Sequence, residues 1–73
     1  GSQTEMVLSV GMDKSGTPLI TILNGNNPIC YRLPEKLSNW AYVVIGMANK
    51  GENLFPSQVV FSKEKDKYFV DIL

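Results

Sequence analysis

The chain has 73 residues, in which seven Lys and Arg balance seven Asp and Glu, with no His and one Cys. A chain of this length forms one domain that buries only about 60–65% of the surface exposed when it is unfolded, so we expect modest stability. Its apolar fraction of 44% and charged fraction of 19% exclude the composition of a disordered chain. The two signs of charge are interspersed, which argues against a protein that neutralises many nucleic-acid phosphates.

The first predicted element is a strand at residues 6–12. Apolar side chains alternate there with smaller ones, and this period of two predicts one buried face. The predicted buried set is Met6, Leu8, Val10 and Met12. Gly1-Ser2 resembles a tag remnant, so we expect residues 1–5 to be a tag remnant and flexible N-terminus, and residues 6–73 to be the single small domain.

Two further strands follow, each bounded by turn residues. Residues 13–16 break the first strand, and residues 18–23 are apolar on both faces, which predicts a central strand covered on both sides. Residues 24–27 read Asn-Gly-Asn-Asn, and these residue types accept the positive φ values that tight hairpin turns require. Residues 29–33 then form the third strand.

The segment at residues 34–51 fits two structures. Its apolar residues recur at helical spacing, Pro34 suits a first helical turn, and Lys50-Gly51 suits a helix C-terminus. The apolar positions are Leu37, Trp40, Ala41, Val44, Met47 and Ala48. Residues 42–45 are rich in β-branched side chains, which favour a strand. We expect a helix over residues 36–49, with a strand as the open alternative.

The C-terminal part reads as a hairpin. Strands are predicted at residues 58–62 and 68–73, joined by a charged tip at residues 63–67. In the last strand the alternation puts Tyr68, Val70 and Ile72 on one face and Phe69, Asp71 and Leu73 on the other.

These elements predict an α+β fold, a small single domain of antiparallel β-β-β-α-β-β order with one helix packed on a curled sheet. All-β alternatives are an OB-like small barrel plugged by the helix, or an SH3-like barrel if the ambiguous segment is a strand. We expect Trp40 to be buried where the helix meets the sheet, with Leu37, Val44, Ile22 and Val59 as its neighbours.

The sequence offers little for catalysis. It has no His, no glycine-rich phosphate loop and no metal-ligand spacing. Six of the seven carboxylates lie in predicted ends or turns, and Asp71 alternates onto an outward face. We therefore expect no enzyme, no catalytic residue, no metal and no cofactor.

The single cysteine provides information about the cellular compartment of the protein. Cys30 lies in an apolar run and has no internal disulfide partner, so we expect a reduced, half-buried thiol. No signal peptide is evident, and no apolar run nears the roughly 18 residues of a membrane span. These features predict a cytoplasmic or otherwise intracellular protein that does not associate with membranes.

The aromatic residues suggest a function. Most must be core in so small a chain, but Tyr42 points off the apolar helix face, and Phe69 shares a strand face with Asp71 and Leu73. Exposed aromatic residues beside polar groups are typical of binding surfaces. We expect a non-enzymatic interaction module, or a small regulatory or inhibitory protein, that uses Phe69, Asp71, Leu73 and Tyr42 to bind another protein or a second copy of itself.

The alternative is a small barrel that binds single-stranded nucleic acid. The hairpin tip near Phe69 carries Lys63, Lys65 and Lys67, so a base could stack on the ring while the lysines contact phosphate. Glu64 and Asp66 lie between these lysines and weaken the attraction, so protein remains the favoured partner.

Overall fold

The computed structural model describes residues 2–73, which form five antiparallel strands and one α-helix. The elements are β1 (Ser2–Met12), β2 (Pro18–Asn24), β3 (Asn27–Arg32), a 3₁₀ turn (Glu35–Leu37), α1 (Ser38–Asn49), β4 (Ser57–Glu64) and β5 (Lys67–Ile72). The predicted small α+β domain with an antiparallel sheet is confirmed. The helix answers the question left open for residues 36–49, and it excludes the six-stranded alternative.

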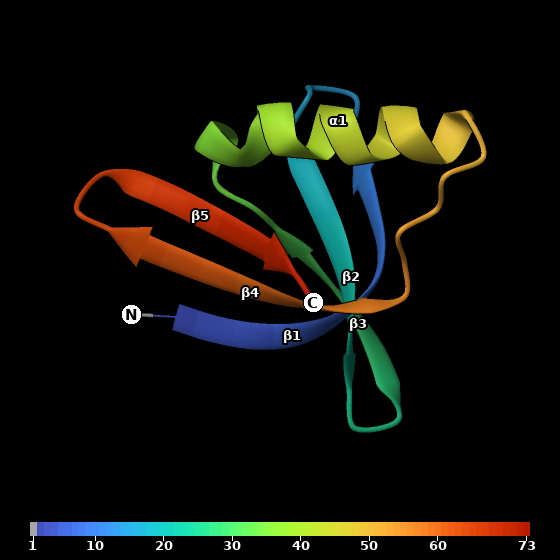
Figure 1. Cartoon of the computed structure of the whole chain (residues 1–73), viewed down its shortest axis with the longest axis horizontal. Coiled ribbons are helices and arrows are strands. Elements are labelled where there is room, and N and C mark those ends of the chain that lie inside the picture. Colours follow the sequence, from blue (N-terminus) through green and yellow to red (C-terminus); the bar gives the residue numbers. More distant parts are fainter. Residues whose placement is uncertain (1) are drawn as a thin grey trace.

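The sheet has the order β3-β2-β1-β4-β5, so the first strand is central (Figure 1). β1 divides its length between two partners: residues 2–7 pair with β4, and residues 7–12 pair with β2. The register to β2 shifts between Val7 and Ser9, so Leu8 is an extra residue with no counterpart. Such a β-bulge bends its strand, and the two halves of the sheet separate beyond it.

Because of the bulge, the face predicted to be buried in the first strand is wrong for residues 6 and 7. Val7, expected on the outside, is fully buried on the inner face, which is the face that the helix covers. Met6 lies opposite Gln58 on the outer face, because the extra residue Leu8 shifts the alternation by one. β1 also begins at Ser2, so residues 2–5, expected to lie outside the domain, are part of the sheet; Gly1 lies outside the described residues.

The core fills the space between the inner face and the helix. Its buried apolar residues are Val7, Ile20, Ile22, Val59, Leu37, Ala41 and Val44. Trp40 packs against this core from the helix, as predicted, but it is half-buried. Its indole meets two rings edge to face, with centroid distances of 6.4 Å to Phe55 and 5.9 Å to Phe61. These contacts tie the helix to the β4 side of the sheet.

The outer face of the sheet has no helix on it, which corrects two predictions. β2 was expected to be covered on both sides, yet Leu23 is 39% exposed and Leu19 is only half-buried. Cys30 is exposed and not half-buried, because it lies opposite Thr21 on the outer face of the edge strand β3. One helix can cover only one face of a sheet.

The first predicted turn is held by its aspartate. Asp13 Oδ1 accepts hydrogen bonds from the backbone N–H groups of Ser15 and Thr17, both at 2.9 Å, and from Ser15 Oγ at 2.7 Å. The hydroxyl of Ser15, followed by the backbone N–H of Thr17, lowers the pKa of Asp13 from its ordinary value of 3.8. The ionised form of this carboxylate is therefore favoured by folding.

Asp13→Asn is expected to lower the thermal midpoint near neutral pH, because the amide keeps an acceptor but loses the charge that strengthens these bonds. A lowered pKa contributes stability above the ordinary value of 3.8, and this contribution is lost as the pH falls through the folded-state pKa. The difference between the two proteins should thus shrink in acid. Thermal scans across pH measure it, and equal midpoints near neutral pH would contradict the assignment.

Candidate functional site

Three of the predicted partner-binding residues share one surface. Phe69 and Asp71 lie opposite Ser62 and Val60 in β4, which puts them on the outer face, and the backbone N–H of Leu73 bonds to the carbonyl of Gln58 at 2.9 Å. Phe69 is 48% exposed and Leu73 is 72% exposed. The structure therefore brings these three side chains together on the uncovered face. Their role in binding, and self-association through this face, stay predictions.

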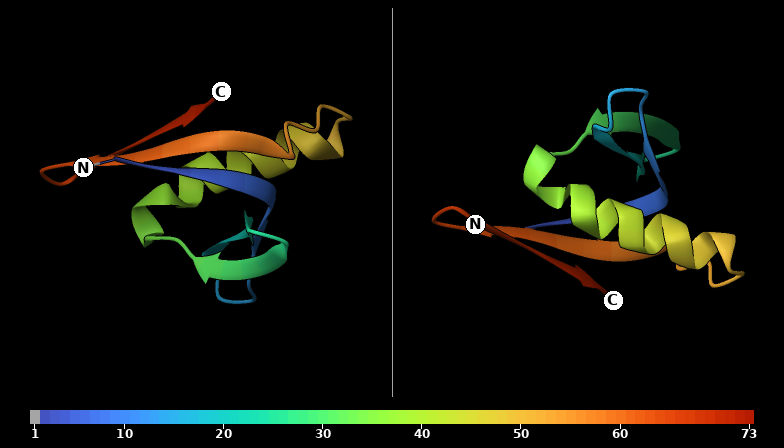
Figure 2. Two further views of the ribbon diagram at one scale, coloured as in Figure 1. Left: turned by 90° about the horizontal axis from the view of Figure 1, so that it is seen from below. Right: turned by 90° about the horizontal axis from the view of Figure 1, so that it is seen from above.

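The fourth predicted residue lies elsewhere. Tyr42 is 61% exposed on the helix, which covers the inner face of the sheet (Figure 2). Phe69 faces the other way, from the outer face. One flat interface cannot include both residues, so the structure separates Tyr42 from the other three.

The predicted basic hairpin does not present one basic face. The Nζ of Lys63 lies 5.3 Å from the centroid of the Tyr68 ring, on the inner side of the hairpin. Lys67 lies opposite Glu64, and Lys65 occupies the turn with a φ of 57°. Phe69 alternates onto the face opposite Tyr68, so Lys63 is turned away from its ring. Lys65 and Lys67 line one small pocket with Phe69, but Glu64 and Asp66 line the same pocket and offset their charge.

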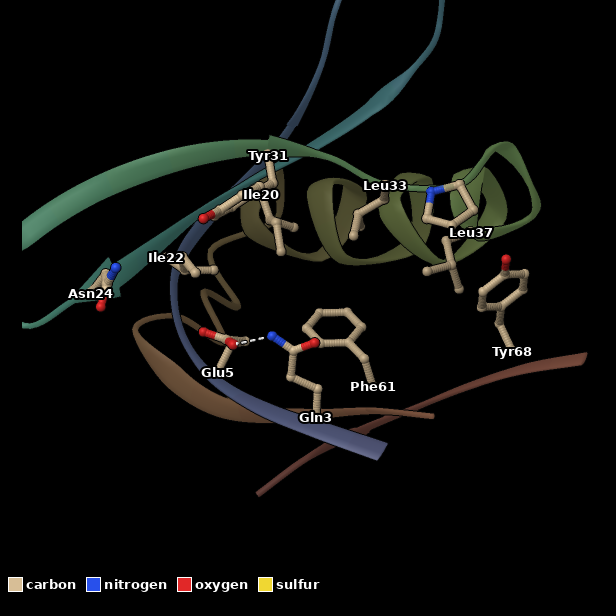
Figure 3. A pocket seen from close by; sticks show the side chains of 11 residues that line it. Gln3, Glu5, Ile20, Ile22, Asn24, Tyr31, Leu33, Leu37, Phe61 and Tyr68 are labelled. Carbon is tan, nitrogen blue, oxygen red and sulfur yellow. Dashed lines mark hydrogen bonds between the residues drawn. The ribbon is translucent and has the colours of Figure 1, made fainter. Parts of the chain in front are cut away.

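A cleft of about 520 Å³ opens on the inner face, beside the 3₁₀ turn and the start of the helix (Figure 3). It is lined by Gln3, Glu5, Ile20, Ile22, Asn24, Tyr31, Leu33, Pro34, Leu37, Phe61 and Tyr68. None of the residues predicted to bind a partner is among them. The cleft is thus a candidate site that the sequence analysis missed.

The floor of the cleft comes from the first half of β1. Gln3 and Glu5 lie opposite Phe61 and Val59 in β4, and the alternation that buries Val7 turns both polar side chains inward. The amide Nε2 of Gln3 donates a hydrogen bond to Oε1 of Glu5 at 2.5 Å (Figure 3). The side chain of Glu5 is therefore oriented at the floor of the cleft by a hydrogen bond that is exposed to solvent.

The walls are mostly apolar and aromatic. Ile20, Ile22 and Leu33 come from the β2–β3 half of the sheet and the loop after it. Figure 3 shows Tyr31 on that side and the Phe61 and Tyr68 rings on the opposite side. The cleft therefore combines apolar surface with a few polar groups, which is the usual make-up of a ligand site.

The cleft includes the place where β1 and β2 separate. Residues 2–6 of β1 pair with β4 on one side, but the ladder to β2 begins only at Val7. β2 itself continues through Asn24 alongside β3. Gln3, Glu5 and Asn24 all line the cleft, so the edge of β1 that no strand pairs lies next to it.

Few groups near the cleft could carry chemistry. Among its lining residues, Glu5 is the one carboxylate, and there is no Ser, Thr or Cys to act as a nucleophile. Within residues 2–73, no three Asp, Glu or Cys side chains come together as metal ligands. In the same part of the chain, no helix has both the length and the apolar character needed to cross a membrane.

No protein-family model matches the chain, and neither a curated protein nor a solved structure matches it.

Proposed function

We propose that this protein is a non-enzymatic interaction module that binds an extended segment of another protein in the cleft on the inner face of its sheet. The observation that carries the proposal is the split in the sheet, where the unpaired edge of β1 adjoins a cleft of about 520 Å³ with apolar walls. This volume lies within the range typical of ligand sites, roughly 300–1,000 Å³.

The unpaired edge supports binding of an extended chain. An added strand gains main-chain hydrogen bonds from an open sheet edge, and adjacent pockets select its side chains. Residues 3–6 of β1 offer such an edge, because β4 occupies only one of their two sides. The rings of Tyr31, Phe61 and Tyr68 and the apolar walls beside them would receive alternate side chains of the segment.

The lining also favours binding over catalysis. Nucleophilic catalysis commonly pairs a nucleophile with an adjacent base, and the cleft holds no Ser, Thr, Cys, Lys or His. Glu5 is the one carboxylate in the cleft, and it accepts a hydrogen bond from the amide of Gln3. An amide does not exchange a proton with a carboxylate, so this pair supports recognition. Nucleic acid gains less support, because the lysines of the hairpin are spread over both of its faces.

A selection from a random heptapeptide library is expected to yield peptides whose binding perturbs the amide resonances of residues lining the cleft. Asn24 is exposed at the rim, and Asn24→Trp should fill the mouth without touching the core. We expect it to weaken binding at least about tenfold, the equivalent of 1.4 kcal/mol. NMR titration of the labelled protein measures both the site and the affinity.

Asn26→Trp is the matched control, since Asn26 lies in the same hairpin turn but outside the cleft. This variant should bind the selected peptides as the unmodified protein does. Peptides that perturb Phe69 and Leu73 instead, and that ignore Asn24→Trp, would move the binding site to the outer face. A steep loss of oligonucleotide binding with salt, without any peptide binding, would favour the nucleic-acid alternative.

A further inference from the structure

We infer that the cleft recognises a cationic side chain, Lys or Arg, of the bound segment, with the Glu5 carboxylate as its counter-ion. This inference rests on the proposed function and names the chemistry that would give it selectivity. It is carried by the charge of the cleft, by the hydrogen bonding of Glu5, and by the aromatic surface around it.

The charge of the cleft is the first observation. Of its eleven lining residues, Glu5 is the one with a charged side chain, and the ammonium of Lys63 lies beside the lining, over the ring of Tyr68. Glu5 is half-buried, its hydrogen bond with Gln3 is exposed to solvent, and Ile20 and Ile22 are among the apolar residues of the same lining. A cation within about 4 Å of an ionised carboxylate interacts favourably with it.

The hydrogen bonding of Glu5 is the second observation. An ionised carboxylate has about four acceptor positions. The side-chain amide of Gln3, two residues earlier in the same strand, donates a hydrogen bond to Oε1 of Glu5 and so orients the Glu5 side chain. This single amide donor leaves acceptor positions for an ammonium or guanidinium group that enters the cleft.

The aromatic rings are the third observation. Ring faces attract cations within about 6 Å, and apolar walls accept the methylene stem of a Lys or Arg side chain. Tyr68 already has such a partner within the chain, since Lys63 Nζ lies 5.3 Å from the centroid of its ring. Tyr31, which is 47% exposed on the opposite wall, is the ring most open to an incoming cation.

Another explanation of Glu5 makes a different prediction. A charge that points inward beside an unpaired strand edge protects that edge against aggregation. If this were its whole role, Glu5→Gln would promote aggregation but would leave ligand preference unchanged. The two explanations are therefore separated by measuring selectivity and solubility on the same variant.

The experiment uses small probes and peptides with the full chain. NMR titrations compare n-butylammonium and n-butylguanidinium with neutral n-butanol, and an acetylated, amidated Leu-Ala-Lys-Ala-Leu peptide with its Arg and norleucine versions. We expect the cationic probes and peptides to bind in the cleft about fivefold more tightly than the neutral ones, as a half-exposed ion pair allows. Glu5→Gln should remove this preference.

Glu52→Gln is the matched control, because it makes the same change of charge in the connection after the helix, away from the cleft. It should keep the preference for cations. Equal binding of neutral and cationic probes, or an unchanged preference in Glu5→Gln, would overturn the inference. A thermal midpoint of Glu5→Gln close to that of the unmodified protein confirms that the comparison concerns a folded domain.

The outcomes also separate this inference from the proposed function. Peptides that bind in the cleft without preferring Lys or Arg over norleucine would refute the cationic selectivity and leave the interaction module intact. Cleft binding by n-butylammonium, with no binding by any peptide, would refute a partner polypeptide as the source of the cation.

Discussion

Replacing Trp40 by alanine is expected to lower the free energy of unfolding by about 3 kcal/mol, at the lower end for a large aromatic residue because Trp40 is half-buried. The change removes both edge-to-face contacts, to Phe55 and to Phe61, that join the helix to the β4 side of the sheet. A domain of this size has a total stability of about 4–11 kcal/mol, so the loss is a large share of it. Urea denaturation followed by circular dichroism measures the effect, since the variant lacks its tryptophan.

Two variants serve as controls for Trp40. Trp40→Phe keeps an aromatic ring at the contact and should lose less stability than alanine does. Tyr42→Ala removes a ring that is 61% exposed on the same helix and should change stability by about 0.5 kcal/mol or less. A Trp40→Ala protein as stable as Tyr42→Ala would contradict the packing of the helix on the sheet.

Alanine substitutions of Phe61 and Phe69 should have sharply different effects on the free energy of unfolding, although both residues lie in the C-terminal hairpin. Phe61 faces inward, packs against the core and lies 5.9 Å from Trp40 between ring centroids, so Phe61→Ala should cost about 3 kcal/mol. Phe69 is 48% exposed on the outer face, and Phe69→Ala should leave the free energy of unfolding nearly unchanged. Denaturation midpoints of the two variants test the assignment of faces directly.

The contact between the two rings provides a further check. Because Trp40 and Phe61 touch, the double alanine variant should be less destabilised than the sum of the single changes, by about 1 kcal/mol. Strict additivity would mean that the two rings do not interact. A Phe69→Ala protein that is as unstable as Phe61→Ala would show that the outer face is packed.

Features with local causes could be predicted from the sequence. The hairpin at Gly25 and Asn26 follows from residue types that accept positive φ, and Gly25 has a φ of 63°. The helix follows from apolar residues at helical spacing, and Leu37 and Val44 are buried as that spacing requires. The exposure of Phe69 follows from the alternation along its strand.

The cleft depends on pairing between distant segments, which is why the sequence did not reveal it. Residues 6–12 alternate as a regular strand would, and nothing local marks Leu8 as the extra residue. The inward orientation of Glu5 follows only once β1 is known to be shared between β2 and β4. A polar Gln-x-Glu sequence before Val7 was the one available signal, and it also fits an exposed terminus.

The extra residue in β1, Leu8, allows the shape of the cleft to change through the insertion or deletion of one residue. Removing Leu8 would leave Val7 inward, Ser9 outward and Val10 inward, so every other side chain of the strand would keep its face. A one-residue deletion, which elsewhere in a strand exchanges the two faces, would here only straighten the ladder. The angle between the two halves of the sheet thus depends on the presence of Leu8 in the bulge. The buried residues that stabilise the domain are other side chains, which keep their faces when Leu8 is removed.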